Sequence, residues 1–202
     1  MKKVLSLILL ALLFSGCAFG RTINYAGRSN FTIPPESQKV IVAVHDQRPY
    51  IQDNYKSPDY VGIQQSIAGV PYNVSTKSGN PLADDLGMII VNTLNYGKVS
   101  ATQAKIPPSW SFTDVKEKVL GKEKDSKVYY IKMMEWRTII HFRVELNYDL
   151  QLLVFDDQAN EVANNEEKGS FYLDKDVPGK ENLANATAGI LGKLFAVKES
   201  QK

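Results

Sequence analysis

The chain is poor in the residues that build most catalytic and metal sites. Its 202 residues include one cysteine, Cys17, and two histidines, His45 and His141. A single cysteine excludes an intrachain disulfide, and two histidines offer few ligands for zinc. The sequence also contains no HExxH, CxxC, GxSxG, GxGxxG or P-loop motif. We therefore expect no enzymatic activity, no metal site and no cofactor.

An excess of charge of either sign is also missing. The chain has 24 Lys and Arg residues against 22 Asp and Glu residues, but Lys2 and Lys3 belong to the N-terminal segment described below. Without residues 1–16, the remaining 186 residues carry 22 charges of each sign. A neutral domain without a basic run has no electrostatic reason to bind nucleic acid.

The only cysteine ends a segment that is typical of bacterial lipoprotein signals. Lysines at 2–3 precede an apolar run over 4–14, and the small residues Ser15 and Gly16 stand directly before Cys17. The apolar run is shorter than the roughly 20 residues that a membrane span needs, as in a signal peptide. We predict cleavage between Gly16 and Cys17 and acylation of the Cys17 thiol.

Residue 18 predicts the membrane that holds this anchor. In bacterial lipoproteins, aspartate after the acylated cysteine commonly favours retention in the inner membrane, and here the residue is Ala18. Several acyl chains also hold a protein more firmly than one chain does. We expect an outer-membrane protein that faces the periplasm. The alternative is an ordinary secretory signal followed by an incidental cysteine.

Periodicity predicts one domain after a short tether. We divide the chain into a signal peptide (1–16), a lipidated cysteine with its tether (17–38) and a single α+β domain (39–202). The β-branched run at 40–44 predicts a central strand. Further strands are predicted at 99–106, 127–136, 141–152 and 161–173, and helices at about 80–97, 113–124 and after 179. Asn80 is expected to cap the first of these helices, which Pro81 begins.

This order of elements favours an α+β two-layer sandwich. Two amphipathic helices would cover one face of a mixed, mostly antiparallel sheet. The first helix has its apolar stripe at Leu82, Leu86, Ile89, Ile90 and Leu94, and the last has its stripe at Leu183, Ala186, Ile190, Leu191 and Leu194.

Residues 49–80 are polar and rich in turn residues, and they predict a long loop. The loop contains four tyrosines, Tyr50, Tyr55, Tyr60 and Tyr72. Tyrosine suits half-wet surfaces, so these residues either fix the loop to the domain or form an interface for a partner.

The strongest polar cluster is His45-Asp46-Gln47-Arg48, where the central strand ends. Its functional interpretation is a site for a ligand or partner, with His45, Asp46 and Arg48 as the contacts. Its structural interpretation is that Asp46 accepts backbone N–H groups, while Arg48 pairs with Asp46 or with a neighbouring carboxylate. We favour the structural role.

The lipobox-like segment, the Asp46-Gln47-Arg48 turn, the order of elements, and Asn182 with Ala186 in the last helix together resemble the YajG-type outer-membrane lipoproteins. The resemblance implies a lipid-anchored small α+β domain and no particular activity. The segment at 50–80 is longer than this family leads us to expect.

Three functions remain open on the sequence. The leading hypothesis is a non-enzymatic, lipid-anchored component that binds protein partners in the cell envelope. The second is a carrier or sensor of a lipid or other apolar ligand, with Met133, Met134 and Trp136 at the edge of a groove. The structural interpretation, which we favour, places these three residues in the core or at the rim of the sheet. The third is a hydrolase of envelope polymers that uses His45 and Asp46.

Overall fold

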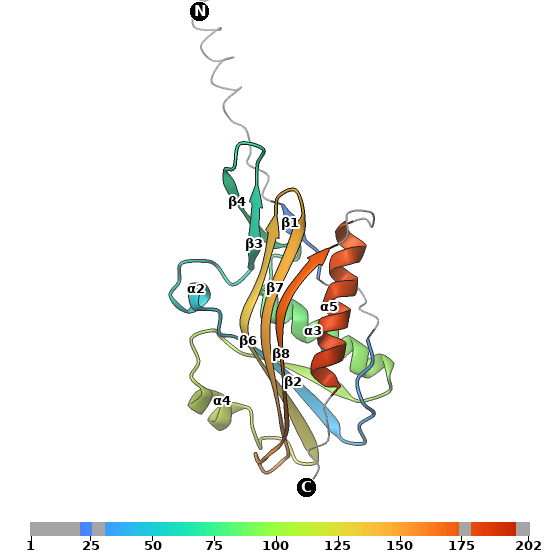
Figure 1. Cartoon of the computed structure of the whole chain (residues 1–202). Coiled ribbons are helices and arrows are strands. Elements are labelled where there is room, and N and C mark those ends of the chain that lie inside the picture. Colours follow the sequence, from blue (N-terminus) through green and yellow to red (C-terminus); the bar gives the residue numbers. More distant parts are fainter. Residues whose placement is uncertain (1–20, 26–30, 174–178, 197–202) are drawn as a thin grey trace, which may run out of the picture.

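The protein folds around one curled, mixed sheet that resembles half a barrel (Figure 1). The computed structural model describes residues 21–25, 31–173 and 179–196. In these ranges it has eight strands and four helices. The strands are β1 (Thr22–Ile23), β2 (Lys39–Asp46), β3 (Tyr60–Gln65), β4 (Pro71–Thr76), β5 (Ala101–Lys105), β6 (Ser126–Ile140), β7 (Val144–Phe155) and β8 (Glu161–Leu173). The helices are α2 (Pro49–Gln52), α3 (Leu82–Tyr96), α4 (Phe112–Lys118) and α5 (Gly179–Phe195).

The long strand β6 organises the sheet. On one side it pairs antiparallel with β7, which in turn pairs antiparallel with β8. On its other side it pairs with two different strands, both parallel to it. β2 pairs with the first part of β6, up to Asp46 opposite Met133, and β3 pairs with the last part, from Gly62 opposite Thr138. The sheet therefore has a break between β2 and β3, alongside residues 134–137 of β6.

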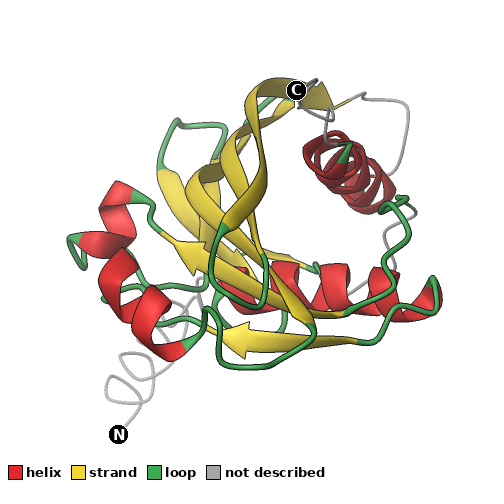
Figure 2. Cartoon of the chain, turned by 90° about the horizontal axis from the view of Figure 1, so that it is seen from below, coloured by secondary structure: helices red, strands yellow, loops and turns green. Residues whose placement is uncertain are grey.

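Strand β2 is buried on both faces. Its sequence, KVIVAVHD, is nearly all β-branched or small, as expected for a central strand of parallel pairs. Val40, Val42 and Val44 point into the larger core, which α3 and α5 complete. Ile41 and Ala43 point into a smaller core on the opposite face, which α4 covers with Val115. Figure 2 shows the helices on both sides of the sheet.

The prediction of a two-layer sandwich with two main helices on one face is wrong. The structure is mostly strands, the sheet curls, and α4 lies on the face opposite α3 and α5. Register shifts interrupt the pairing of β6 with β7 and of β7 with β8, and such bulges increase the local twist of a sheet. The apolar stripes predicted for α3 and α5 are confirmed, because all of their residues are buried.

The prediction of a long loop at 49–80 is also wrong, because this segment contains α2 and the antiparallel pair β3–β4. The glycines and polar residues of this segment are typical of a loop, so the sequence pattern did not predict the strands. Gly62, with a φ of +153°, is the clearest case: a Cβ atom there would lie 1.9 Å from the carbonyl oxygen of Thr138. The glycine allows β3 to approach β6 closely rather than forming a turn.

Part of the segment assigned to the tether (17–38) belongs to the folded domain. β1 pairs with β4, and Tyr25 is buried, where its hydroxyl accepts a hydrogen bond of 3.0 Å from Nε1 of Trp136. Glu36 accepts hydrogen bonds from Lys127 and Tyr129. The predicted signal peptide, Gly16 and Cys17 lie outside the described residues.

The remaining predicted elements are confirmed with shifted ends. Pro81, rather than Asn80, occupies the cap position of α3, and no side chain caps this helix. Phe142, which falls within the strand predicted at 141–152, lies in the turn between β6 and β7 and is 77% exposed. Among the described residues, no helix is long and apolar enough to cross a membrane.

Candidate functional site

The end of β2 places His45 and Asp46 on opposite faces of the sheet. Side chains alternate along a strand, so Asp46 follows Val42 and Val44 toward the larger core, whereas His45 lies on the face of the smaller core. The two neighbours therefore do not form the hydrogen-bonded pair that the hydrolase hypothesis requires.

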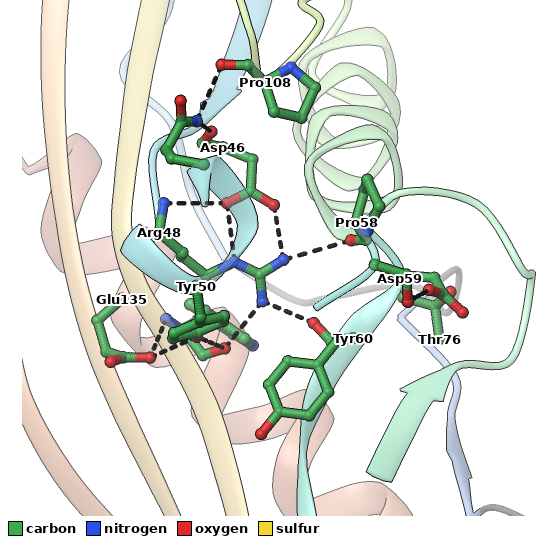
Figure 3. A network of polar contacts seen from close by, with 12 residues as sticks. Asp46, Arg48, Tyr50, Pro58, Asp59, Tyr60, Thr76, Pro108 and Glu135 are labelled. Atoms are coloured by element: carbon green, nitrogen blue, oxygen red, sulfur yellow. Dashed lines mark hydrogen bonds and ion pairs between the residues drawn. The ribbon is translucent and has the colours of Figure 1, made fainter. Parts of the chain in front are cut away.

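Asp46 and Arg48 form a buried, bidentate ion pair (Figure 3). Arg48 donates from Nε to Oδ1 of Asp46 at 2.8 Å and from Nη2 to Oδ2 at 2.6 Å, and its backbone N–H also donates to Oδ1 at 3.2 Å. Both residues are fully buried. The structural contact predicted from the sequence is thereby confirmed.

The rest of the guanidinium fills the break between β2 and β3. Nη1 donates to the carbonyl oxygens of Tyr60 at 2.7 Å and Trp136 at 3.2 Å, and Nη2 also donates to that of Pro58 at 3.3 Å. With the two bonds to Asp46, all five guanidinium N–H groups have an acceptor within the chain. Arg48 therefore has no donor left for a ligand in this conformation.

Burial lowers the pKa of Arg48, but the hydrogen bonds and negative charge of Asp46 more than offset it, so the pKa lies above its ordinary value. Arg48 therefore stays charged. The carboxylate that faces it accepts three N–H groups, all from Arg48.

Both ring nitrogens of His45 also have hydrogen-bond partners within the chain. Its Nε2 lies 3.2 Å from the carbonyl oxygen of Pro108, which can only accept, so Nε2 carries the proton. Its Nδ1 lies 2.7 Å from Oη of Tyr130 and 3.3 Å from Nε2 of Gln47, and accepts from them. Burial lowers the pKa of His45 below its ordinary value. The ring is a neutral, internally bonded part of the interior.

The four tyrosines of the 49–80 segment separate into two classes. Tyr50 and Tyr60 meet edge to face, with ring centroids 5.5 Å apart, and the Tyr50 hydroxyl donates to Glu135 at 2.7 Å. Burial raises the pKa of both hydroxyls. Tyr55 and Tyr72 are 77% and 46% exposed, so only they can offer an interface.

The residues proposed to edge a lipid groove lie mainly in the core. Met133 and Trp136 are fully buried in the larger core, and only Met134, at the bulge of β6, is partly exposed. This placement favours the structural interpretation of all three residues. Within 21–25, 31–173 and 179–196, no three His, Cys, Asp or Glu residues are close enough to hold a metal ion.

Sequence reasoning missed three residues that contact β6 or its neighbours: Tyr25 and Glu135 near Arg48, and Glu36 near the start of β6. Tyr25 and Glu36 come from the segment assigned to a tether, and Glu135 lies in a strand where it showed no partner. No local pattern marks them, because their partners are distant in the sequence. The only sequence signal for these contacts was Tyr25, an isolated tyrosine in a polar segment.

No protein-family model matches the chain. No curated protein matches its sequence either. The solved structures that match the chain include three from named organisms. A Xanthomonas campestris protein of the DUF330 family matches with 14% identity over 88% of this chain and 89% of its own, at a TM-score of 0.48.

The others are the lipoprotein GNA1162 of Neisseria meningitidis and a PelC dodecamer of Paraburkholderia phytofirmans. GNA1162 matches with 12% identity over 76% of this chain and 95% of its own, at a TM-score of 0.33. PelC matches with 14% identity over 85% of this chain and 96% of its own, at a TM-score of 0.40. Such low similarity carries no functional argument, and the resemblance to YajG-type proteins stays a prediction.

Replacing Asp46 should strongly destabilise the fold. In Asp46→Asn, Arg48 stays buried without its counter-charge, and breaking a buried pair in this way costs about 3–5 kcal/mol in the free energy of unfolding. Urea unfolding followed by circular dichroism measures this cost. The control is Lys118→Ala, which removes the exposed ion pair with Asp114 and a cation–π contact with Trp110 and should destabilise the fold far less. Equal costs for the two variants would contradict the structural role.

His45 should make the fold sensitive to mild acid. The unfolded chain takes up a proton on this histidine near its ordinary pKa of about 6.5, whereas the folded chain resists it, so stability falls as the pH drops through that value. Urea midpoints at pH 7.5 and 5.5 should therefore differ more for the wild type than for His45→Gln. His141→Gln controls for loss of an exposed histidine. If the two urea midpoints differ as much in His45→Gln as in the wild type, the neutral, buried state assigned to His45 is refuted.

Proposed function

We propose that this chain is a bacterial lipoprotein, anchored through Cys17 in the outer membrane and facing the periplasm, where it acts without catalysis as a binding component of an envelope assembly. The observation that carries the proposal is the N-terminal segment: lysines at 2–3, the apolar run at 4–14, Ser15 and Gly16, and then the only cysteine. An exported chain with one unpaired cysteine directly after small residues is best explained by acylation.

The internal hydrogen bonds of the turn formed by residues 45–48 support a role in binding rather than catalysis. Arg48 donates only to acceptors within the chain, and both ring nitrogens of His45 have internal partners. A catalytic acid, base or nucleophile must reach a substrate. The strongest polar cluster in the sequence therefore offers no reactive group, and this favours a function of the surface.

Tyr55 is the best candidate contact with a partner protein. It follows Asn54, whose φ of +57° turns the chain outward beyond α2, and its ring is 77% exposed. Nζ of Lys56 lies 5.0 Å from the ring centroid. An exposed tyrosine beside a cation is a typical element of polar protein interfaces.

Acylation gives the first test of the proposal. The protein extracted from membranes should have the mass of residues 17–202 plus a diacylglyceryl group and an N-terminal acyl chain, and it should sediment with the outer membrane. Cys17→Ser should remain uncleaved or appear in the soluble fraction, because it has no thiol to accept lipid. A wild-type chain that keeps residues 1–16, or that carries a bare thiol, would refute the anchor.

The partner is tested by a photo-reactive amino acid at position 55 in intact cells. We expect a crosslinked product of defined mass, identified by mass spectrometry and reproduced when the captured protein carries the reciprocal crosslinker. The same amino acid at Tyr96, an exposed tyrosine on α3, serves as the matched control. Products that are identical at both positions, or absent at position 55, would contradict an interface at Tyr55.

A further inference from the structure

Six exposed apolar residues gather at one end of the sheet. Ile140 at the end of β6 pairs with Gln64 of β3 on one side and with Val144 of β7 on the other. The β3–β4 connection and the β6–β7 turn therefore project from the same end, which is the upper end in Figure 1. Val144 in turn pairs with Leu173, which brings the end of β8 alongside. We call these six residues the apolar tip: Ile67, Val70, Tyr72, Phe142, Phe171 and Tyr172.

The apolar tip is unusual in exposure and in charge. Ile67 is 100% exposed and Phe142 is 77% exposed. From Tyr60 to Thr76 the sequence has no Asp, Glu, Lys or Arg, although 23% of the whole chain is charged. An uncharged hairpin with exposed apolar residues tends to aggregate in water unless a partner or a membrane covers it.

The direction of β1 relates the start of the described chain to the apolar tip. β4 runs away from the tip, from Pro71 to Thr76, and β1 runs parallel to it, with Thr22 opposite Ser75. Arg21, the first described residue, therefore lies on the tip side of Thr22, where its carbonyl oxygen accepts from the backbone N–H of Ser75. Cys17 precedes Thr22 by five residues, a reach of at most about 17 Å. Along β4, the distance from Ser75 back to Pro71 is only about 13 Å.

We propose that the apolar tip inserts into the surface of the same bilayer that holds the acyl chains of Cys17. This inference rests on the proposed anchor. Aromatic residues favour the level of the lipid headgroups, and Tyr72, Phe142 and Tyr172 would lie there, with Ile67 and Val70 at the acyl boundary. Arg143 and His141, exposed beside Phe142, are placed to meet lipid phosphates.

Insertion fixes the orientation of the domain, which an acyl anchor alone does not. An acyl anchor restrains one point, whereas the tip adds contacts from the β3–β4 hairpin, the β6–β7 turn and the end of β8. The β6 axis would then stand away from the membrane, with β2, β5 and α4 on the distal side.

Quenching of tryptophan fluorescence by brominated lipid tests the insertion. Acylated full-length protein carrying Ile67→Trp or Phe142→Trp is reconstituted into phosphatidylethanolamine–phosphatidylglycerol vesicles that contain phosphatidylcholine brominated high in its acyl chains. Quenching of the added tryptophan, measured against wild type, should be at least about twofold stronger than for Tyr96→Trp, because insertion reaches about 5–10 Å into the headgroup–acyl boundary. Tyr96 is as exposed but lies beside β5, at the opposite end of the sheet.

The outcomes separate the anchor from the insertion. Mass spectrometry of the same samples reports acylation. If the chain is acylated and both tip variants are quenched no more than Tyr96→Trp, the insertion is refuted while the anchor stands. If the tip tryptophans are shielded from aqueous iodide but not quenched by lipid, a second copy or a protein partner covers the tip and the inference is wrong. A chain without acyl groups refutes both proposals.

Discussion

The ion pair between Asp46 and Arg48 holds together a sheet that would otherwise be split. β2 and β3 share one side of β6, and neither reaches residues 134–137, so the carbonyl groups at the break lack strand partners. The guanidinium of Arg48 donates to Trp136 on β6 and Tyr60 on β3, while Asp46 holds it from β2. One planar side chain thus replaces several missing ladder bonds. Lysine could not, because its point charge lacks the fork of five donors.

The burial of this pair limits what the turn can do. A buried guanidinium is costly unless every donor is satisfied, and here the counter-charge and three carbonyl groups satisfy them all. Gln47 completes the joint by donating its backbone N–H to the carbonyl oxygen of Met133. The Asp-Gln-Arg sequence is therefore understood as the connection between two half-sheets. The polar groups of Asp46 and Arg48 serve this connection through contacts within the chain.

Local patterns predicted the elements but not their assembly. The β-branched run of β2, the stripes of α3 and α5, and the alternation of β7 are local signals, and each element was found. β3 was missed because Gly62 and the residues Gln64 and Gln65 resemble a loop, although Gly62 serves a close contact with Thr138. Arg48 was correctly paired with Asp46 because they are two residues apart. Its bonds to Tyr60 and Trp136 depend on tertiary folding and leave no trace in the sequence.

The sheet also gives the molecule two unlike ends. Near Ile140, the hairpin from β3 to β4 is uncharged and apolar. Near Ser126, at the other end of β6, the surface is charged, with ion pairs from Lys39 to Glu123 and from Lys127 to Glu36. Because a strand rises about 3.3 Å per residue, the 15 residues of β6 separate these ends by at most about 50 Å. Because β1 pairs parallel with β4, the first residue of β1 is the one nearer to the apolar end. In an anchored protein, the charged end and α4 would then extend into the aqueous compartment, where soluble partners are met.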